Sequence, residues 1–335
     1  MTEPPLESPP CLSAGKLVRD GLILLMATIV VAGACSMFGV AEWTGNVWRM
    51  RLTRLATAAA VGVALSVAGM ALQALLRNPL AEPYILGVSS GAGVGVLVGS
   101  ILAARGLLQA GWASTPVLAL VGAVGSCLVV YGIAQRRGRL DPYVLLLSGV
   151  VINVFNGALM LAILKLSRSS DIINFVGWGM GQISDLTEGS LLTVCAACIL
   201  CGWVVLFLRG GWFNVLGLGD DVAGSVGVPV RRLRAETFAI AALMTASAVA
   251  LAGPVGFVGL IVPHLCRMII GPDHRRLALF SGFIGAMFLM LADTLCRTVG
   301  EWVNVGSVPV GIITALSGGP FFIHLLRARL KETSA

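Results

Sequence analysis

The sequence predicts an all-α polytopic membrane protein with about ten transmembrane helices and both termini in the cytoplasm. Hydrophobic residues make up 57% of the 335 residues and charged residues only 12%, whereas a soluble domain has about 25% charged residues. The mean hydropathy is +0.92. Glycine is abundant, at 42 residues, which suits helices that pack closely in lipid. The composition excludes a soluble globular domain.

A membrane-spanning helix needs roughly 20 mostly apolar residues, and ten stretches approach that length. In chain order they are residues 21–40, 55–76, 84–104, 116–134, 143–164, 190–208, 235–252, 255–270, 277–299 and 307–326. They define one transmembrane domain over residues 21–327. The polar, proline-rich start MTEPPLESPP indicates a disordered cytoplasmic tail over residues 1–20, and residues 328–335 are expected to form a second cytoplasmic tail.

The positive charge of the chain follows its expected topology. The net charge is +7, and most of the 23 lysines and arginines fall in segments that ten spans would place in the cytoplasm. The positive-inside rule explains this bias without a ligand. We therefore expect contact with membrane lipid and none with nucleic acid.

The cysteines and histidines do not form a metal-binding pattern. Cys195, Cys198 and Cys201 lie in one apolar run without histidine or carboxylate neighbours, and free cysteine packs as a small apolar residue. His264 and His274 have no third ligand nearby in the sequence. We expect no metal site.

The chain has no phosphate-binding loop. Such a loop ends in Gly-Lys-Ser or Gly-Lys-Thr, but Lys16 and Lys165 precede leucine and Lys331 precedes glutamate. We expect no cofactor on this chain, so any ATP and Mg²⁺ would be bound by a partner subunit.

One polar loop, residues 209–234, is longer than the others. Its sequence RGGWFNVLGLGDDVAGSVGVPVRRLR interleaves apolar residues with glycines and Asp220 and Asp221. It predicts one or two short helices at the membrane surface, with both aspartates near a helix start, where the helix dipole favours them. The segment is either a plain connection or a docking element for a cytoplasmic partner.

Residues 77–95, RNPLAEPYILGVSSGAGVG, interrupt two apolar runs. Pro79 and Pro83 lack an N–H and bias the residues before them away from helix, which predicts a rigid bend. Non-helical backbone at membrane depth must be buried in protein or line a water-filled path. Residues 77–83 are therefore expected to line a pore, the alternative being an ordinary turn between helices.

Three sequence blocks resemble a known family. They are RNPLAEPYILGVSSGAG, the loop GLGDDVAGSVGVPVRRLR, and AGPVGFVGLIVPHLCRMIIGPDHRRL with the following LADTLCRT and VPVGIITALSGGPFFIHLL. Together they are similar to the permease subunits of FecCD-type, or type II, ABC importers, which carry iron–siderophore complexes, haem or vitamin B12. The resemblance runs from about Arg51 to Arg329.

This resemblance implies a type II ABC importer permease in the inner (cytoplasmic) membrane. A second permease copy or a close homologue would complete a pathway along the dimer axis. Two cytoplasmic ABC ATPase subunits and an extracytoplasmic substrate-binding protein would be the other partners. An iron–siderophore complex is the expected cargo, with haem and vitamin B12 as alternatives.

The family pattern also implies roles for polar residues at the outer face. Arginines matching Arg51, Arg54 and Arg297 dock the binding protein, because guanidinium groups pair with carboxylates in a fixed orientation. The alternative is that they extend toward lipid headgroups. Asp293, one helical turn before Arg297, is expected in a structural ion pair or a helix cap.

Nearer the cytoplasm, the family pattern places a gate at Asn78 and Leu80 and at the turn entering the fifth span, Pro142 and Tyr143. This turn departs from the small hydroxyl residues of some members, which changes the expected shape of the constriction.

Two further sets of positions follow from the resemblance. The fifth span borders the pathway in the family, so it is expected to present its asparagines to the path, Asn153 and Asn156. The ATPase-coupling role is expected for four residues of the long loop, Gly219, Asp220, Ala223 and Gly227.

Two other classes of function remain open on the residues alone. An ion-gradient transporter would use an intramembrane carboxylate, for which Asp293 is the candidate. A membrane-embedded enzyme would need clustered His, Asp or Ser groups at one depth, and the sequence shows no such cluster. We expect a transport subunit and not an enzyme.

Overall fold

The computed structural model describes residues 14–38, 45–107, 114–136, 139–185, 187–304, 306 and 308–333. These residues fold almost entirely into helices. The described strands, each of two residues, form one antiparallel hairpin in which Gln135 pairs with Leu140 and Arg136 with Arg139. The elements are α1 (Ala14–Met37), α2 (Gly45–Leu76), the 3₁₀ helix η1 (Pro83–Leu86), α3 (Val88–Ala104), α4 (Ser114–Ala134), β1 (Gln135–Arg136), β2 (Arg139–Leu140), α5 (Pro142–Leu166), α6 (Ser169–Gly179), α7 (Gly189–Leu208), α8 (Gly210–Leu216), α9 (Asp220–Ser225), α10 (Val230–Ala252), α11 (Val258–Ile270), α12 (His274–Val303) and α13 (Val310–Thr333).

Every predicted apolar run contains one α-helix, which confirms the all-α polytopic prediction. Among the described residues, seven helices are long and apolar enough to cross a membrane, and three shorter apolar helices, α3, α11 and α13, fill the remaining predicted runs. Helix α2 begins at Gly45 and is therefore longer than predicted, because its first turns carry arginines that a hydropathy window excludes.

The predicted disorder of residues 1–20 was partly wrong, whereas the cytoplasmic position of residues 328–335 stays a prediction. Helix α1 begins at Ala14 and α13 continues to Thr333, so residues 14–20 and 328–333 are helical. The N-terminal extension is held by a contact that the sequence does not show, the ion pair at 3.0 Å between Asp20 and Arg276 of α12. Residues 1–13, 334 and 335 of the predicted tails lie outside the described residues.

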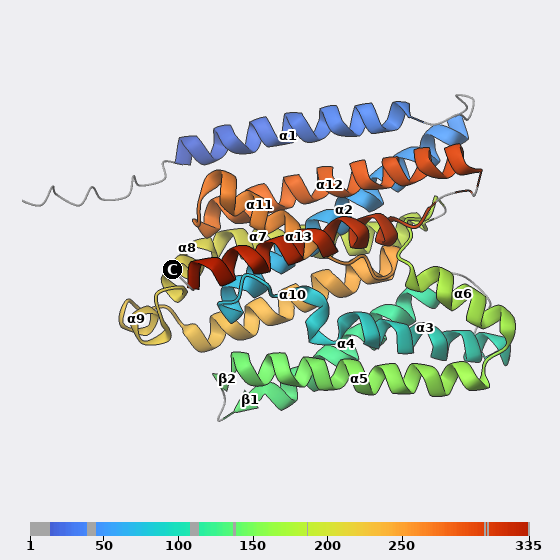
Figure 1. Cartoon of the computed structure of the whole chain (residues 1–335), viewed down its shortest axis with the longest axis horizontal. Coiled ribbons are helices and arrows are strands. Elements are labelled where there is room, and N and C mark those ends of the chain that lie inside the picture. Colours follow the sequence, from blue (N-terminus) through green and yellow to red (C-terminus); the bar gives the residue numbers. More distant parts are fainter. Residues whose placement is uncertain are drawn as a thin grey trace, which may run out of the picture.

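Helices α2 and α10 form the centre of the bundle. Within their most apolar stretches, 78% of the residues of α2 and 72% of those of α10 are buried, against 22% in α1 and in α5. Figure 1 shows α1 and α5 at opposite edges of the molecule, with α2 crossing obliquely between them. The central helices therefore hold the polar groups that a lipid-facing helix could not.

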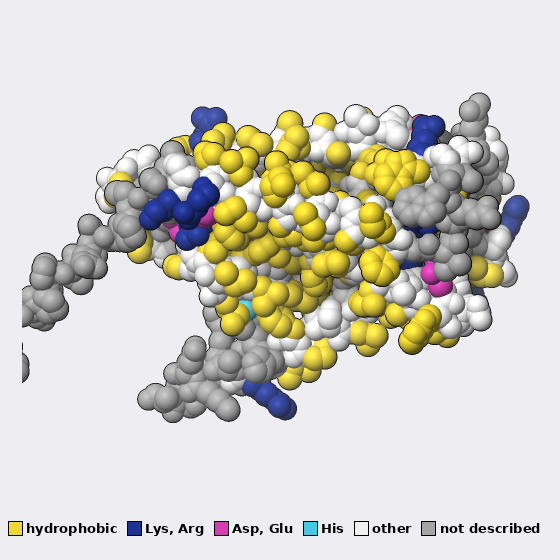
Figure 2. All heavy atoms as spheres, turned by 90° about the horizontal axis from the view of Figure 1, so that it is seen from above, with side chains coloured by type: hydrophobic (Ala, Val, Ile, Leu, Met, Phe, Trp, Pro, Cys, Tyr) yellow, Lys and Arg dark blue, Asp and Glu magenta, His cyan; other side chains and the backbone are white. Residues whose placement is uncertain are grey.

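The outer surface is apolar over the middle of the molecule. Figure 2 shows hydrophobic side chains gathered there, while charged side chains lie toward the two ends. On α1 the exposed residues include Leu22, Met26 and Val30, and on α5 they include Val154 and Phe155. An apolar belt of this kind suits the hydrocarbon core of a bilayer.

Glycines allow pairs of helices to approach closely. A Cβ atom on Gly122 of α4 would lie 2.2 Å from the carbonyl oxygen of Gly91 on α3, and one on Gly62 of α2 would lie 2.1 Å from that of Gly285 on α12. Since real contacts of this type are much longer, these positions exclude larger residues. Close backbone packing of this kind replaces the hydrophobic effect as the force between helices in lipid.

The two ends of the bundle differ. The short helices α8 and α9, the β hairpin and the described end of α13 lie at one end, here called the α9 end, and α6 lies at the other, the α6 end. Figure 1 also shows α3 confined to the part of the bundle toward α6. The chain between α2 and α3 therefore bends at residues 77–82 and forms only the short 3₁₀ helix η1 before α3 begins.

Candidate functional site

Two breaks in the helices meet inside the bundle. The first lies between α2 and η1, where residues 77–82 are not helical, as predicted from the prolines. The second lies between α10 and α11, where Gly253 and Phe257 adopt φ angles of 66° and 67°. A positive φ is uncommon for a residue such as phenylalanine, so the surrounding contacts must hold this backbone in place.

Glu82 and Tyr84 supply those contacts. A carboxylate oxygen of Glu82 accepts a hydrogen bond of 2.6 Å from the Phe257 N–H. The Tyr84 hydroxyl donates to the Val255 carbonyl at 3.1 Å and accepts from the Val255 N–H at 2.9 Å. Side chains of the first break thus satisfy the backbone of the second, as lipid-depth backbone requires.

A hollow of about 470 Å³ opens beside the two breaks. Its lining combines polar groups, Glu82, Ser90 and Asn153, with the large side chains Met160 and Trp178. Asn153 of α5 accepts a hydrogen bond of 2.7 Å from Ser90 of α3 and donates to the Tyr84 and Ile85 carbonyls at 3.3 Å. The hollow is therefore a polar patch on an apolar wall, and the pathway role of Asn153, one of its lining residues, stays a prediction.

Asn156, the second predicted lining residue, lies elsewhere. Its side chain is buried and donates to the Ser90 and Ser126 hydroxyl oxygens at 3.0 and 2.9 Å. It joins α3, α4 and α5, and this burial argues against a lining role for Asn156 in this conformation.

The α9 end contains the predicted coupling loop, which forms two short helices, α8 and α9, as the sequence indicated. Asp220 and Asp221 occupy the first turn of α9, as predicted. Gly219 precedes that turn with a φ of 129° and Gly227 follows the helix with a φ of 87°, conformations that side chains rarely adopt. Ala223 is buried, so it anchors α9 to the bundle.

The opposite side of this loop is exposed and apolar. Leu218, Val222 and Val226, at intervals of four residues, are 72%, 45% and 68% exposed. They lie on α9 or directly beside it, and Figure 1 shows α9 at the same end of the bundle as the β hairpin. Three large apolar side chains on one exposed side of the loop form an apolar surface patch.

The predicted gate residues lie in the two segments that lead toward this end. The Asn78 side chain accepts a hydrogen bond of 3.0 Å from the Leu80 N–H, which shapes the bend. Pro142 is the first residue of α5, and the Asp141 carboxylate caps that helix through the Tyr143 N–H at 2.9 Å. The segments are well ordered by local contacts, and their gating role stays a prediction.

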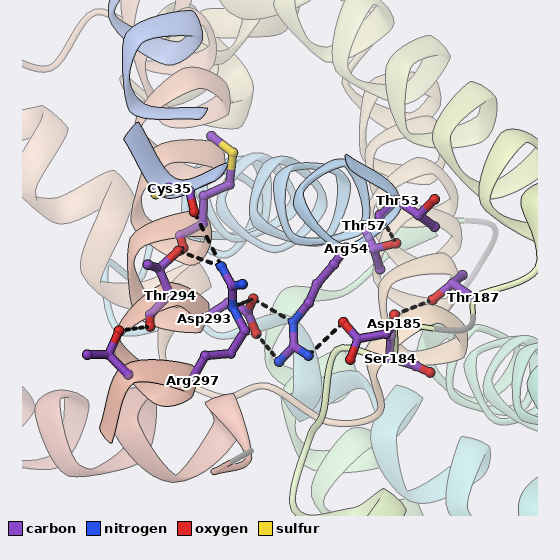
Figure 3. A network of polar contacts seen from close by, with 12 residues as sticks. Cys35, Thr53, Arg54, Thr57, Ser184, Asp185, Thr187, Asp293, Thr294 and Arg297 are labelled. Carbon is purple, nitrogen blue, oxygen red and sulfur yellow. Dashed lines mark hydrogen bonds and ion pairs between the residues drawn. The ribbon is translucent and has the colours of Figure 1, made fainter. Parts of the chain in front are cut away.

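The α6 end holds a buried ion cluster, shown in Figure 3. Arg54 of α2 donates two hydrogen bonds, of 2.8 and 2.9 Å, to the two carboxylate oxygens of Asp293 on α12. Its third donor bonds Asp185, in the segment between α6 and α7, at 2.9 Å. Arg297 lies 3.6 Å from Asp293. The predicted ion pair of Asp293 with Arg297 is therefore present, but Arg54 is its closer partner.

The other predicted docking arginines stabilise the end of α1. The Arg51 guanidinium donates to the Ser36 carbonyl at 3.0 Å and that of Arg297 to the Cys35 carbonyl at 3.5 Å. The last carbonyls of a helix have no partners within it and favour positive charge. In this conformation Arg51 and Arg54 are buried and engaged within the chain, so their docking role stays a prediction.

Sequence reasoning missed three of these residues. Asp185 and Glu82 were assigned no role, and Tyr84 falls at the start of the predicted span over residues 84–104. Helix α6 was also missed, although its start carried a signal: Ser169 and Ser170 precede Asp171, whose carboxylate accepts from the Arg168 N–H at 3.3 Å, the arrangement typical of a helix N-terminus.

Seven described helices that are long and apolar enough to cross a membrane, with an apolar surface around them, define a multi-pass membrane protein. The chain belongs to the FecCD transport family, whose family model matches residues 22–328. It is therefore a permease subunit of an ABC importer, a transport component and not an enzyme.

Individual relatives agree with this assignment. The chain is 38% identical to the cobalamin import system permease protein BtuC of Halobacterium salinarum, over 93% of this chain and 82% of that protein. It is 34% identical to the hemin transport system permease protein HmuU of Yersinia pestis, over 94% and 96%. Among solved structures, a metal-chelate type ABC transporter in an inward-facing conformation matches with a TM-score of 0.81 and 25% identity, over 92% and 99% of the two chains.

Proposed function

We propose that the α9 end receives a cytoplasmic ABC ATPase. The observation that carries this proposal is the exposed apolar set of Leu218, Val222 and Val226 on a loop that Ala223 anchors to the bundle. A rigidly seated apolar patch can transmit the movement of a partner, which a loose loop cannot. ATP and Mg²⁺ would be bound by that partner, and two ATPase subunits would serve a pair of permeases, formed with a second copy or a close homologue.

The α6 end would then face the outside of the cytoplasmic membrane and meet the substrate-binding protein. Asp185 and Arg297 are the members of the ion cluster nearest to solvent there. A carboxylate of the binding protein could compete with Asp185 for Arg54, which would reconcile the buried arginine with the predicted docking role of Arg51, Arg54 and Arg297.

For the cargo, we propose a metal chelate of the iron–siderophore type. The relatives are named for cobalamin and hemin and the solved structure for metal chelates, and all of these are metal ions enclosed in large organic ligands. The hollow beside Asn153 and Trp178 offers weak hydrogen bonding and a broad apolar wall, which suits passage of such a ligand without tight binding. Haem and vitamin B12 are the alternatives.

The ATPase proposal is tested with Leu218→Glu. The permease is co-expressed with its cognate ATPase, and the amount of ATPase that co-purifies is measured. A charge in an apolar contact should strongly reduce co-purification. The control is Leu107→Glu, which changes a similarly exposed leucine three residues after α3 and should leave co-purification unchanged. Normal ATPase binding by Leu218→Glu would refute the docking assignment.

The cargo is tested in proteoliposomes that contain the whole transporter and its binding protein. ATP-dependent uptake of a ferric siderophore, hemin and cobalamin is compared at equal concentrations. Preferential uptake of hemin or cobalamin would overturn the siderophore proposal and leave the ATPase proposal standing.

A further inference from the structure

One carboxylate oxygen at the start of α9 binds two arginines from different parts of the bundle. The Oδ1 atom of Asp220 accepts a hydrogen bond from Nη2 of Arg77, which follows the last residue of α2. The same oxygen accepts a hydrogen bond of 2.9 Å from Nη2 of Arg234 on α10. Asp220 is thus the point where α9 is tied to two other segments.

Arg77 connects α9 and α8 to the first predicted gate segment. Its Nε and Nη2 atoms also donate to the carbonyl of Leu216, the last residue of α8, at 3.1 and 2.8 Å. Its backbone adopts a φ of 48°, a conformation that non-glycine residues rarely adopt. Asn78 follows directly, so the guanidinium that holds α8 and α9 is fixed to the bend.

Arg234 connects Asp220 to the second predicted gate segment. Its side chain is only 10% exposed, and its Nη1 atom donates to the Leu140 carbonyl at 3.1 Å. Leu140 precedes Asp141, whose carboxylate accepts hydrogen bonds from the Tyr143 and Val144 N–H groups. A chain of contacts therefore runs from α9 through Arg234 to the start of α5.

We propose that Asp220, Arg77 and Arg234 form a mechanical link that moves the bend at residues 77–80 and the start of α5 together with α9. Arg77 and Arg234 are positioning residues, because they act through Asp220 and the backbone and do not touch cargo. The inference rests on the proposed function, in which α9 is the element that the ATPase moves.

The chemistry of the link suits this role. Hydrogen bonds between guanidinium and carboxylate are charge-assisted and stronger than neutral ones, and the planar guanidinium fixes the direction of each bond. Since Arg234 is nearly buried, separating it from Asp220 would leave an uncompensated charge. The contacts therefore favour a movement in which α9, the bend at residues 77–80 and the start of α5 stay together.

The test measures coupling in proteoliposomes that contain permease, ATPase and binding protein. The variants Arg77→Gln, Arg234→Gln and Asp220→Ala are compared for ATP hydrolysis and for uptake per ATP hydrolysed. We expect about a tenfold loss of uptake per ATP in each, within the range of interaction energies of contacting residues, while ATPase co-purification is retained. Arg231→Gln, which removes an exposed arginine three residues before Arg234, is the matched control and should keep normal coupling.

Double variants separate a link from three independent effects. If Asp220 is the shared point, the double variant Arg77→Gln with Asp220→Ala should lose less coupling than the sum of the two single losses. Any loss beyond that of Asp220→Ala would come from the bonds of Arg77 to the Leu216 carbonyl. Arg77→Lys, which lacks the forked donors, should keep little of the wild-type coupling. Additive losses, or an equal loss in Arg231→Gln, would overturn the inference. If Arg234→Gln does not fold, the Arg77 and Asp220 cycle decides alone, since both side chains are partly exposed.

The two proposals fail differently. Normal ATPase binding by Leu218→Glu would refute the docking assignment. Lost ATPase binding by Leu218→Glu together with normal coupling in Arg77→Gln would refute the link alone.

Discussion

The buried ion cluster at the α6 end should be the most sensitive polar group in the bundle. The side chains of Arg54 and Asp293 are 5% and 1% exposed, whereas that of Asp185 is 52% exposed. Removing one partner of a buried ion pair costs about 3–5 kcal/mol, because the other charge stays buried without compensation. An exposed ion pair contributes only about 0–1 kcal/mol.

Asp293→Asn should therefore lower the free energy of unfolding by about 3 kcal/mol, the lower end of that range, since Arg54 retains Asp185. Asp185→Asn should lower it by less than about 1 kcal/mol. The purified protein is denatured reversibly in detergent, and tryptophan fluorescence monitors the unfolding.

A double variant distinguishes the loss of a charge pair from the loss of packing. Arg54→Leu with Asp293→Leu removes both charges and should be less destabilising than Asp293→Asn alone, because no buried charge is left. If Asp293→Asn and Asp185→Asn prove equally mild, the cluster is not a buried pair in the working protein and the reasoning is refuted.

Two further predictions concern the interior. Gly122→Ala should reduce the yield of folded protein, because its Cβ would lie 2.2 Å from the Gly91 carbonyl oxygen. Gly125→Ala is the control, since Gly125 lies on the same helix with open space around it and should give a normal yield. Equal yields of the two variants on size-exclusion chromatography would contradict the close α3–α4 contact. Tyr84→Phe should lower the free energy of unfolding by about 1–3 kcal/mol, the cost of an unsatisfied buried polar group, and Glu82→Leu should lower it by a similar amount. Glu82→Gln keeps an acceptor for the Phe257 N–H, so it should lower the free energy of unfolding less than Glu82→Leu in the same denaturation assay. Equal losses in the two Glu82 variants would mean that this hydrogen bond does not hold the second break.

The helices of this protein could be predicted from the sequence because each apolar run is a local property of the chain. The two short helices of residues 209–234 were predicted for the same reason, since glycines and Asp220 mark the start of α9 within a few residues. The bend after α2 followed from Pro79 and Pro83, whose effect on the backbone is also local.

The contacts that join these elements could not be predicted. Arg54 and Asp293 are 239 positions apart and Tyr84 and Val255 are 171 apart, so no periodicity relates them. The nearer pairing of Asp293 with Arg297 was visible in sequence and is real, but it is the longer contact in the structure. The burial of Arg51 and Arg54 could not be predicted either, because it depends on where α1 and α12 pack against α2.

The position of α1 has a consequence for biosynthesis. Both of its ends are fastened to α12, through Asp20 and Arg276 at one end and through the Cys35 carbonyl and Arg297 at the other. From Met37 to the start of α12 at His274 the ribosome adds roughly 240 residues, which takes roughly 12–50 seconds at usual rates of synthesis. Throughout that interval lipid or the insertion machinery covers the surface of α1 that α12 later covers. That surface must therefore be apolar enough to face lipid during assembly, and not only to pack against α12 in the finished bundle.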